Sequence, residues 1–192
     1  MASEDLKNRK EEIEELVLAS QDGDHDAFSK LYDIFIDPIY RYVYFRVNAS
    51  DAEDLVETVF LKVWENLKKY KKKEKTYFSS WIFRIAHNLV VDHYRSYKNL
   101  DSLELNIQIP DDNRQHNPIK NVHNVFNQET LKIAISNLKK SHQQILVHKF
   151  INEFSNKEIA EILNKSEGSL RILQFRALKA LKSELKDMGF EY

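Results

Sequence analysis

Turn-forming residues are scarce in this chain, and their scarcity constrains its fold more than any other feature of the sequence. Among 192 residues there are only three glycines and three prolines. Several sheets joined by hairpins would need many such residues at their turns. Because 42% of the side chains are hydrophobic, the chain can build one globular core or two small ones. The composition therefore predicts an all-helical protein.

Several localisation and site classes are excluded by what the sequence lacks. It contains no cysteine, so disulfides and thiolate metal sites are excluded, as is typical of proteins in a reducing cytosol. The first residues, MASEDLKNRKEEIEEL, are acidic and have no apolar core of the signal-peptide kind. No apolar run approaches the roughly 20 residues needed to cross a bilayer. We therefore expect a cytoplasmic protein without membrane insertion.

The charges are segregated along the chain, although the formal net charge is only -1. Residues 1–61 have 6 Lys/Arg against 15 Asp/Glu, whereas residues 62–98 have 10 against 3. Residues 127–192 are mildly basic, with 11 against 8. The two basic parts can each meet a polyanion, while the acidic part would repel it or bind a basic protein partner.

Apolar residues recur at helical spacing through the first half of the chain. One run covers 13–19 and another 27–44, and Asp37-Pro38 within the second predicts that one helix ends and another begins there. Ser50 and Glu53 form a capping-box pattern, which predicts the start of an amphipathic helix.

A charged run separates that helix from the next. Seven of the eight residues in 68–75 are charged, which predicts a loop or a solvated helix end. The following apolar stripe begins at Phe78 and Trp81, and core packing is the interpretation that we favour for both. We also assign the Tyr40, Tyr44 and Phe45 cluster to the core.

The periodicity dissolves between 99 and 126, where two of the three prolines lie. This segment is predicted to be an interdomain linker, and the alternation of Leu103, Leu105, Ile107 and Ile109 suggests that part of it lies extended against a partner surface. The predicted organisation is an extension over 1–14, a domain over 15–98, the linker over 99–126 and a second domain over 127–192.

The strongest local signal is SNKEIAEILNKSEGSLRILQFRALKALKSEL, residues 155 to 185. Ser155 and Glu158 form a capping box, Asn164-Lys165 supplies a tight turn, and Ser166 caps a second helix. Two helices joined by a turn of about three residues are typical of a helix-turn-helix, whose second helix enters the DNA major groove. On spacing alone, a helical hairpin with a solvated charged face is an equally good interpretation.

Four segments resemble one known family, in the family's own order. EIAEILNKSEGSLRILQFRALKALK is similar to the region-4 helix-turn-helix of extracytoplasmic-function sigma factors, which reads the promoter -35 element. DAEDLVETVFLKVWENL resembles region 2.2, which docks on the coiled coil of the polymerase β′ subunit, and FSSWIFRIAHNLVVDHYR resembles region 2.3 to 2.4, which melts and reads the -10 element. GDHDAFSKLYDIF is similar to the family's opening helix.

The resemblance implies an all-α fold with two small helical domains, a sigma region 2 helical bundle and a sigma region 4 helix-turn-helix, joined by an irregular linker. It implies binding to core RNA polymerase, at the β′ coiled coil and the β flap, and to promoter DNA. Polymerase would perform the chemistry, so neither enzymatic activity nor a cofactor is expected. Family members are often held by an anti-sigma factor, although no residue here demonstrates one.

Three sets of contact residues follow from the resemblance and from the need to bind an unpaired base next to a cationic surface that follows the DNA backbone. The expected -35 contacts are Ser166, Glu167, Ser169, Arg171, Gln174, Phe175, Arg176 and Lys179. The expected -10 contacts are Lys72, Lys73, Lys75, Thr76, Tyr77, Arg84, Asn88 and Arg95, with core packing an equal alternative for Tyr77. The expected core-polymerase contacts are Asp51, Asp54, Leu55, Glu57, Thr58, Phe60 and Lys62.

The chain departs from the family pattern at three places. Glu57-Thr58-Val59 replaces the usual Gln-Glu-Thr, Leu138-Lys139 replaces Leu-Pro, and Phe175 stands where histidine is frequent. These departures concern individual contacts rather than the class of protein.

Two other classes of function remain as alternatives. A stand-alone helix-turn-helix regulator would bind duplex DNA tightly without polymerase. A metal enzyme is disfavoured, because a helix places His87 and Asp92 about 500° apart, some 140° from a shared face, which does not suit a helical zinc pair. The sequence also has no glycine-rich phosphate loop, serine elbow or paired-carboxylate signature.

Overall fold

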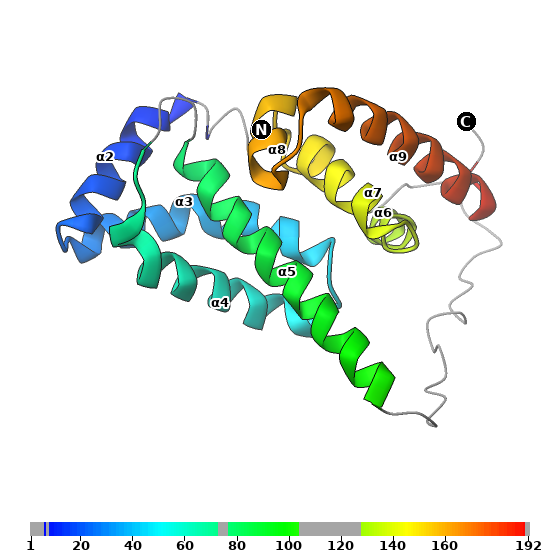
Figure 1. The fold of residues 1–192 in the computed structure, drawn as a ribbon, viewed down its shortest axis with the longest axis horizontal. Coiled ribbons are helices and arrows are strands. Elements are labelled where there is room, and N and C mark those ends of the chain that lie inside the picture. Colours follow the sequence, from blue (N-terminus) through cyan, green and yellow to red (C-terminus); the bar gives the residue numbers. More distant parts are fainter. Residues whose placement is uncertain (1–5, 7, 73–76, 104–127, 191–192) are drawn as a thin grey trace.

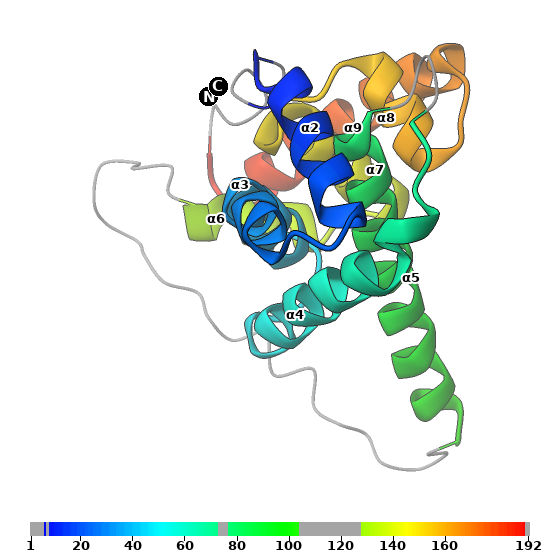
Figure 2. The ribbon, with the colours of Figure 1, turned by 90° about the vertical axis from the view of Figure 1, so that its left-hand side faces the viewer.

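The structure, a computed structural model, describes residues 6, 8–72, 77–103 and 128–190. This part of the chain is helical, has no strand and forms two bodies (Figures 1 and 2). The N-terminal domain comprises α2 (Lys10–Gln21), α3 (His25–Tyr44), α4 (Ala49–Asn66), the short 3-10 helix η1 (Leu67–Lys69) and α5 (Phe78–Leu103). The C-terminal domain comprises α6 (Gln128–Ser136), α7 (Lys140–Leu146), the π-helical η2 (Val147–Ile151), α8 (Asn156–Leu163) and α9 (Glu167–Asp187). The predicted fold class is confirmed.

The core of the N-terminal domain forms where α3, α4 and α5 turn their apolar faces toward one another. Phe35, Val59 and Phe78 are fully buried, and the rings of Phe35 and Phe78 meet edge to face with centroids 5.5 Å apart. Burying a large apolar side chain contributes roughly 1.5 to 3 kcal/mol. Phe78 is therefore a core residue, as the sequence predicted.

The aromatic cluster at the end of α3 corrects one prediction. Phe45 is buried, but Tyr40 is 36% exposed and its ring stacks on that of Tyr44 at the domain surface. The two tyrosines are four residues apart, so their rings lie side by side along α3, and Tyr44 is half-buried against the core.

The predicted helix break at Asp37-Pro38 is wrong, because α3 continues through Pro38 to Tyr44. An interior proline removes one backbone hydrogen bond and costs about 3 kcal/mol. Phe35, Ile39 and Tyr42 lie on both sides of it and are fully buried, so the packing of the continuous helix offsets that cost.

The two domains pack directly against each other, an arrangement for which the sequence made no prediction. One continuous cluster of buried apolar residues runs through both, with α8 packed on α5 and η2 packed on α3. The ring of Tyr42 stacks on His148 with centroids 4.5 Å apart, and Phe83 meets Phe154 edge to face at 4.7 Å. We call this the closed arrangement.

Candidate nucleic-acid interface

Two capping motifs shape the helix-turn-helix. The Oγ of Ser155 accepts a hydrogen bond from the Glu158 N–H at 3.3 Å, and the Glu158 Oε2 accepts one from the Ser155 N–H at 2.9 Å, which completes the predicted capping box. Asn164 ends α8 with a φ of 51°, in the left-handed region. Ser166 then caps α9 by accepting a hydrogen bond from the Ser169 N–H at 3.3 Å.

Burial of one face of α9 determines which side chains reach solvent. Leu170 and Ala177 are fully buried against the rest of the domain. All eight predicted -35 residues lie on α9 or at its cap, and all are exposed except the half-buried Gln174. Phe175 is 70% exposed, and Ile172 beside it is 56% exposed. The sequence pattern did not mark Ile172 as an outward residue.

The segment before α5 is held at both ends by α2. The Nε2 of Gln21 donates to the carbonyls of Leu67 and Tyr70, at 2.7 and 2.8 Å. The Oε1 of Glu14 accepts hydrogen bonds from the Tyr70 hydroxyl and the Phe78 N–H, both at 3.2 Å. The predicted boundary at residue 14 thus falls inside a helix that positions the candidate -10 segment, a role that no local sequence pattern marked.

Among the predicted -10 residues, Lys73, Lys75 and Thr76 lie outside the described residues. Lys72 is exposed, and Tyr77 is half-buried with the Nζ of Lys10 3.7 Å from its ring centroid. The remaining three residues, Arg84, Asn88 and Arg95, have exposed side chains along α5. Arg95 forms an ion pair with Asp92 at 3.3 Å.

A groove of about 410 Å³ runs between α4 and α5 beside Asn88. Its lining consists of Lys62, Asn66, Lys69, Trp81, Ile85, Asn88, Leu89 and Asp92. An apolar wall of this kind is suited to stacking an unpaired base, while a neighbouring lysine can bind the phosphate of that base. Trp81 therefore contributes to this groove as well as to the ring cluster with Tyr70 and Phe78, and the sequence missed Asn66 and Lys69.

Two histidines, His87 and His148, lie against Tyr42 where the domains meet. The Tyr42 hydroxyl accepts a hydrogen bond from the Nη1 of Arg46 at 3.2 Å and lies 3.1 Å from the Nδ1 of His87. Burial, with the charges of Arg46 and Lys165, lowers the pKa of His87 to about 4. Burial also lowers the pKa of His148 far below its usual value. Both imidazoles are therefore neutral at physiological pH, and the described residues contain no group of three or more potential ligands placed to hold a metal ion.

The predicted polymerase contacts lie along α4, and all but one have exposed or half-exposed side chains. Phe60 is only 6% exposed, and its ring lies 4.5 Å from that of Tyr32, so its side chain packs in the core. The same helix exposes 56% of Leu61 and 41% of Trp64. Both views place α4 on the side of the molecule away from α8 and α9 (Figures 1 and 2).

Comparison with known proteins accounts for both domains. Residues 31–99 match the family model for sigma-70 region 2, and residues 129–181 match that for sigma-70 region 4. The chain is 31% identical over 177 residues to the ECF RNA polymerase sigma factor SigW of Bacillus subtilis, covering 86% of this chain and 92% of SigW. The chain belongs to the extracytoplasmic-function sigma factors.

Further relatives agree with this assignment. The sigma factor is 31% identical over 174 residues to the ECF RNA polymerase sigma factor BldN of Streptomyces coelicolor, covering 90% of this chain and 66% of BldN, slightly less than two thirds. Its fold resembles that of CnrH, solved in complex with the cytosolic domain of CnrY, with a TM-score of 0.66 at 20% identity over 90% of this chain and 96% of CnrH.

Membership in the family establishes the general role of the protein. The sigma factor acts in transcription initiation with RNA polymerase and promoter DNA, and members of this family are regulators rather than enzymes. The described helices include none that is long and apolar enough to span a membrane.

In the closed arrangement, the C-terminal domain engages the α5 face of the sigma factor. The Ser80 hydroxyl, which is fully buried, donates to the Glu161 Oε2 at 3.1 Å. The guanidinium of Arg84 donates to the backbone carbonyl of the same glutamate. Arg84 is a predicted -10 contact, so the structure brings this residue against α8.

Proposed function

We propose that this sigma factor binds the -35 element through the outer face of α9. The observation that carries this proposal is an exposed aromatic ring between two exposed cations at one-turn spacing, Arg171, Phe175 and Lys179. Cations on such a face can position the helix on phosphates, and side chains of the first turns can reach base edges. The other expected -35 contacts lie on the same helix or at its cap.

We propose that the -10 element is opened and read by the segment before α5 and by the outer face of α5. The groove beside Asn88 supports this, since it offers an apolar wall to an unpaired base with Lys62 and Lys69 alongside. Arg84 and Arg95 would then follow the backbone of the displaced strand. On this proposal Lys62 contributes to DNA binding as well as, or instead of, binding polymerase.

We propose that core polymerase binds the outward face of α4, which combines exposed Asp54 and Glu57 with the apolar Leu61 and Trp64. Polymerase performs the chemistry, so the sigma factor needs no catalytic residue and no cofactor, and it acts in the cytoplasm at the nucleoid. An anti-sigma factor is a proposed further partner. Support comes from two proteins of similar fold, since CnrH was solved with CnrY, and RpoE with the anti-sigma factor NepR of Bartonella quintana.

The proposal is tested by run-off transcription with core enzyme over a promoter library. The wild-type protein should give promoter-dependent transcripts. Arg171→Ala should reduce them about fivefold or more, because loss of a base-contacting arginine costs about 1 to 3 kcal/mol. The matched control is Lys186→Ala, at the exposed end of α9, which should stay within about twofold.

Two results would contradict the proposal. If no promoter-dependent transcript appeared while the protein alone protected a palindromic duplex, a stand-alone regulator would be the better account. Equal losses for the two variants would show that net charge, rather than the first turns of α9, determines recognition.

A further inference from the structure

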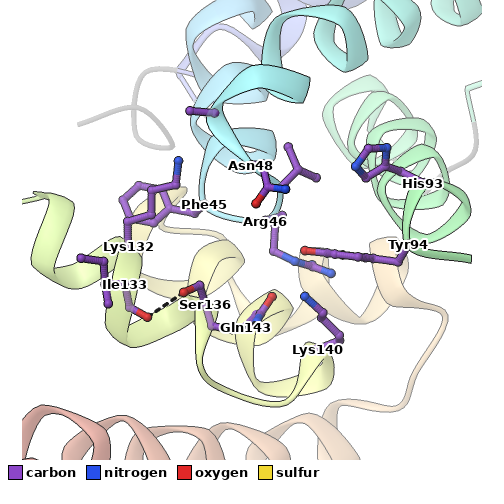
Figure 3. Close-up of a pocket in the computed structure, with 12 residues that line it drawn as sticks. Phe45, Arg46, Asn48, His93, Tyr94, Lys132, Ile133, Ser136, Lys140 and Gln143 are labelled. Carbon is purple, nitrogen blue, oxygen red and sulfur yellow. Dashed lines mark hydrogen bonds between the residues drawn. The ribbon is translucent and has the colours of Figure 1, made fainter. Parts of the chain in front are cut away.

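A cavity of about 420 Å³ lies between the two domains, beside α5 (Figure 3). Three parts of the chain line it: the turn after α3 with the first residue of α4, α5 at His93 and Tyr94, and the α6–α7 hairpin. Its volume falls within the range of small-molecule sites. Neither promoter recognition nor polymerase binding, as proposed above, uses this cavity.

The lining of the cavity is strongly cationic. Arg46, Lys132 and Lys140 contribute to it, and the described lining residues include no aspartate or glutamate. Asp51 lies nearby, but its Oδ2 is 3.3 Å from the Nε2 of His93. A ligand entering the cavity would therefore meet three positive charges and no negative one from its walls.

Arg46 is the strongest indication of an anionic ligand, because this charged residue is only 3% exposed. One guanidinium nitrogen donates to the Tyr42 hydroxyl, but its Nε is buried and has no hydrogen-bond partner among the described residues. An uncompensated buried charge costs several kcal/mol. A bound anion would supply both the missing acceptor and the missing counter-charge.

Aromatic rings hold the two lysines in place around the cavity. The Nζ of Lys132 lies 3.4 Å from the ring centroid of Tyr44, and the Nζ of Lys140 lies 3.8 Å from that of Tyr94. Such contacts stabilise the position of a cation by about 0.5 to 1 kcal/mol at exposed sites, but a neutral ring does not cancel the charge. The positive charges are therefore preorganised and still available to an anion.

Gln143 adds a second requirement for the ligand. Its Nε2 donates to the carbonyls of Ser136 and Leu138, at 2.8 and 2.9 Å, which fixes the orientation of the amide. The opposite atom, Oε1, is buried and has no donor among the described residues. A ligand that satisfied it would carry a hydroxyl or amino group in addition to its negative charge.

We propose that this cavity binds a small phosphorylated metabolite with at least two phosphoryl groups and a hydroxyl or amino donor, the chemistry of a nucleoside diphosphate. Arg46, Lys132 and Lys140 hold the phosphoryl oxygens, since arginine and lysine are the usual phosphate ligands in proteins. Gln143 accepts a hydrogen bond from the sugar or the base.

Binding at this site stabilises the closed arrangement, because the cations come from both domains. Arg46 follows α3 in the N-terminal domain, whereas Lys132 and Lys140 belong to α6 and α7. A ligand that binds only the closed arrangement shifts the closed-to-open ratio about tenfold when its concentration is about ten times its dissociation constant. The coupling is reciprocal, so any partner that binds only when the two domains are apart lowers the affinity for the metabolite.

The test is isothermal titration calorimetry of the full chain with ADP, and separately with inorganic pyrophosphate, at physiological ionic strength, to measure the two dissociation constants. ADP should bind, and pyrophosphate should bind more weakly because it lacks a donor for Gln143. Lys132→Gln and Lys140→Gln should each lower the ADP affinity about tenfold or more, as expected for a lost charge-assisted hydrogen bond. Lys139→Gln, an exposed neighbour outside the lining, is the matched control and should stay within about twofold. Circular dichroism checks that each variant is folded.

Four results would overturn the proposal. The first is the absence of ADP binding at millimolar concentration, and the second is an equal loss of affinity in Lys139→Gln. The third is loss of binding in Arg171→Ala but not in Lys140→Gln, which would place the anion on the DNA-binding face. The fourth is binding of a polyglutamate peptide, but not of ADP, with the same dependence on the two lining lysines, which would assign the cavity to an acidic protein segment.

Discussion

Replacing Glu161 by alanine should open the two domains of this sigma factor. Its carboxylate accepts the hydrogen bond of the Ser80 hydroxyl across the domain boundary at 3.1 Å, and Ser80 is fully buried there. The Arg84 contact is made to the backbone carbonyl of Glu161, so that contact survives the substitution. The variant therefore isolates one hydrogen bond between the domains.

The size of the change in the closed-to-open ratio follows from the buried environment of the Ser80 hydroxyl. A buried hydroxyl that loses its acceptor costs about 1 to 3 kcal/mol. That cost falls on the closed arrangement alone, because the hydroxyl of Ser80 meets water once α8 leaves α5. The closed-to-open ratio should consequently fall roughly 5- to 150-fold.

Single-molecule energy transfer can measure this ratio. The chain contains no cysteine, so Lys68→Cys and Ser183→Cys, both at exposed positions in different domains, give two unique dye sites. Glu184→Ala is the control, because Glu184 accepts a hydrogen bond from Asn137 at 2.7 Å within the C-terminal domain. Glu184→Ala should leave the distribution of dye-to-dye distances unchanged. If Glu161→Ala also left it unchanged, the reasoning about the domain contact would be refuted.

Three further predictions concern stability and recognition. The pKa of His87 is lowered from 6.5 to about 4, so between these pH values the unfolded chain binds a proton there that the folded chain does not. The free energy of unfolding should therefore fall as the pH drops from about 6.5 toward 4, by at most about 3 kcal/mol. His87→Gln should flatten this pH profile in urea titrations. Ser155→Ala should cost about 1 to 2 kcal/mol, and Ser166→Ala, at an exposed cap with a single backbone bond, about 0.5 to 1; the reverse order in the same titrations would contradict the capping argument. Phe154→Ala should cost about 3 to 5 kcal/mol by leaving a cavity, whereas Phe175→Ala should leave the melting temperature unchanged and weaken transcription from -35-dependent promoters.

Local rules predicted some of the parts of the structure that depend on local interactions, but the capping box expected at Ser50 and Glu53 is absent, since α4 begins at Ala49 after Asn48 with no side-chain cap. The S-x-x-E pattern at Ser155 and Glu158 predicted the start of α8, and the scarcity of glycine and proline predicted the fold class. The local rule failed at Pro38, because burial of the residues on both sides outweighs one lost hydrogen bond.

Contacts between the domains could not be predicted in the same way. The stack of Tyr42 on His148, and the bond between Ser80 and Glu161, join residues whose proximity depends on how two separate bodies meet. Neither pair has a spacing or composition that marks it. The anchoring of the segment before α5 by Glu14 was not predicted for the same reason, since its partners lie more than fifty residues away along the chain.

The position of α4 has a consequence for the order of events at a promoter. This helix lies away from α8 and α9 (Figure 2), whereas α5 is covered by α8. On the proposed function, the polymerase-binding face of α4 is accessible, whereas Arg84, one of the proposed -10 contacts, is held against α8. The -10 surface of the free sigma factor would then be incomplete until the domains separate, so polymerase binding would precede full recognition of a promoter.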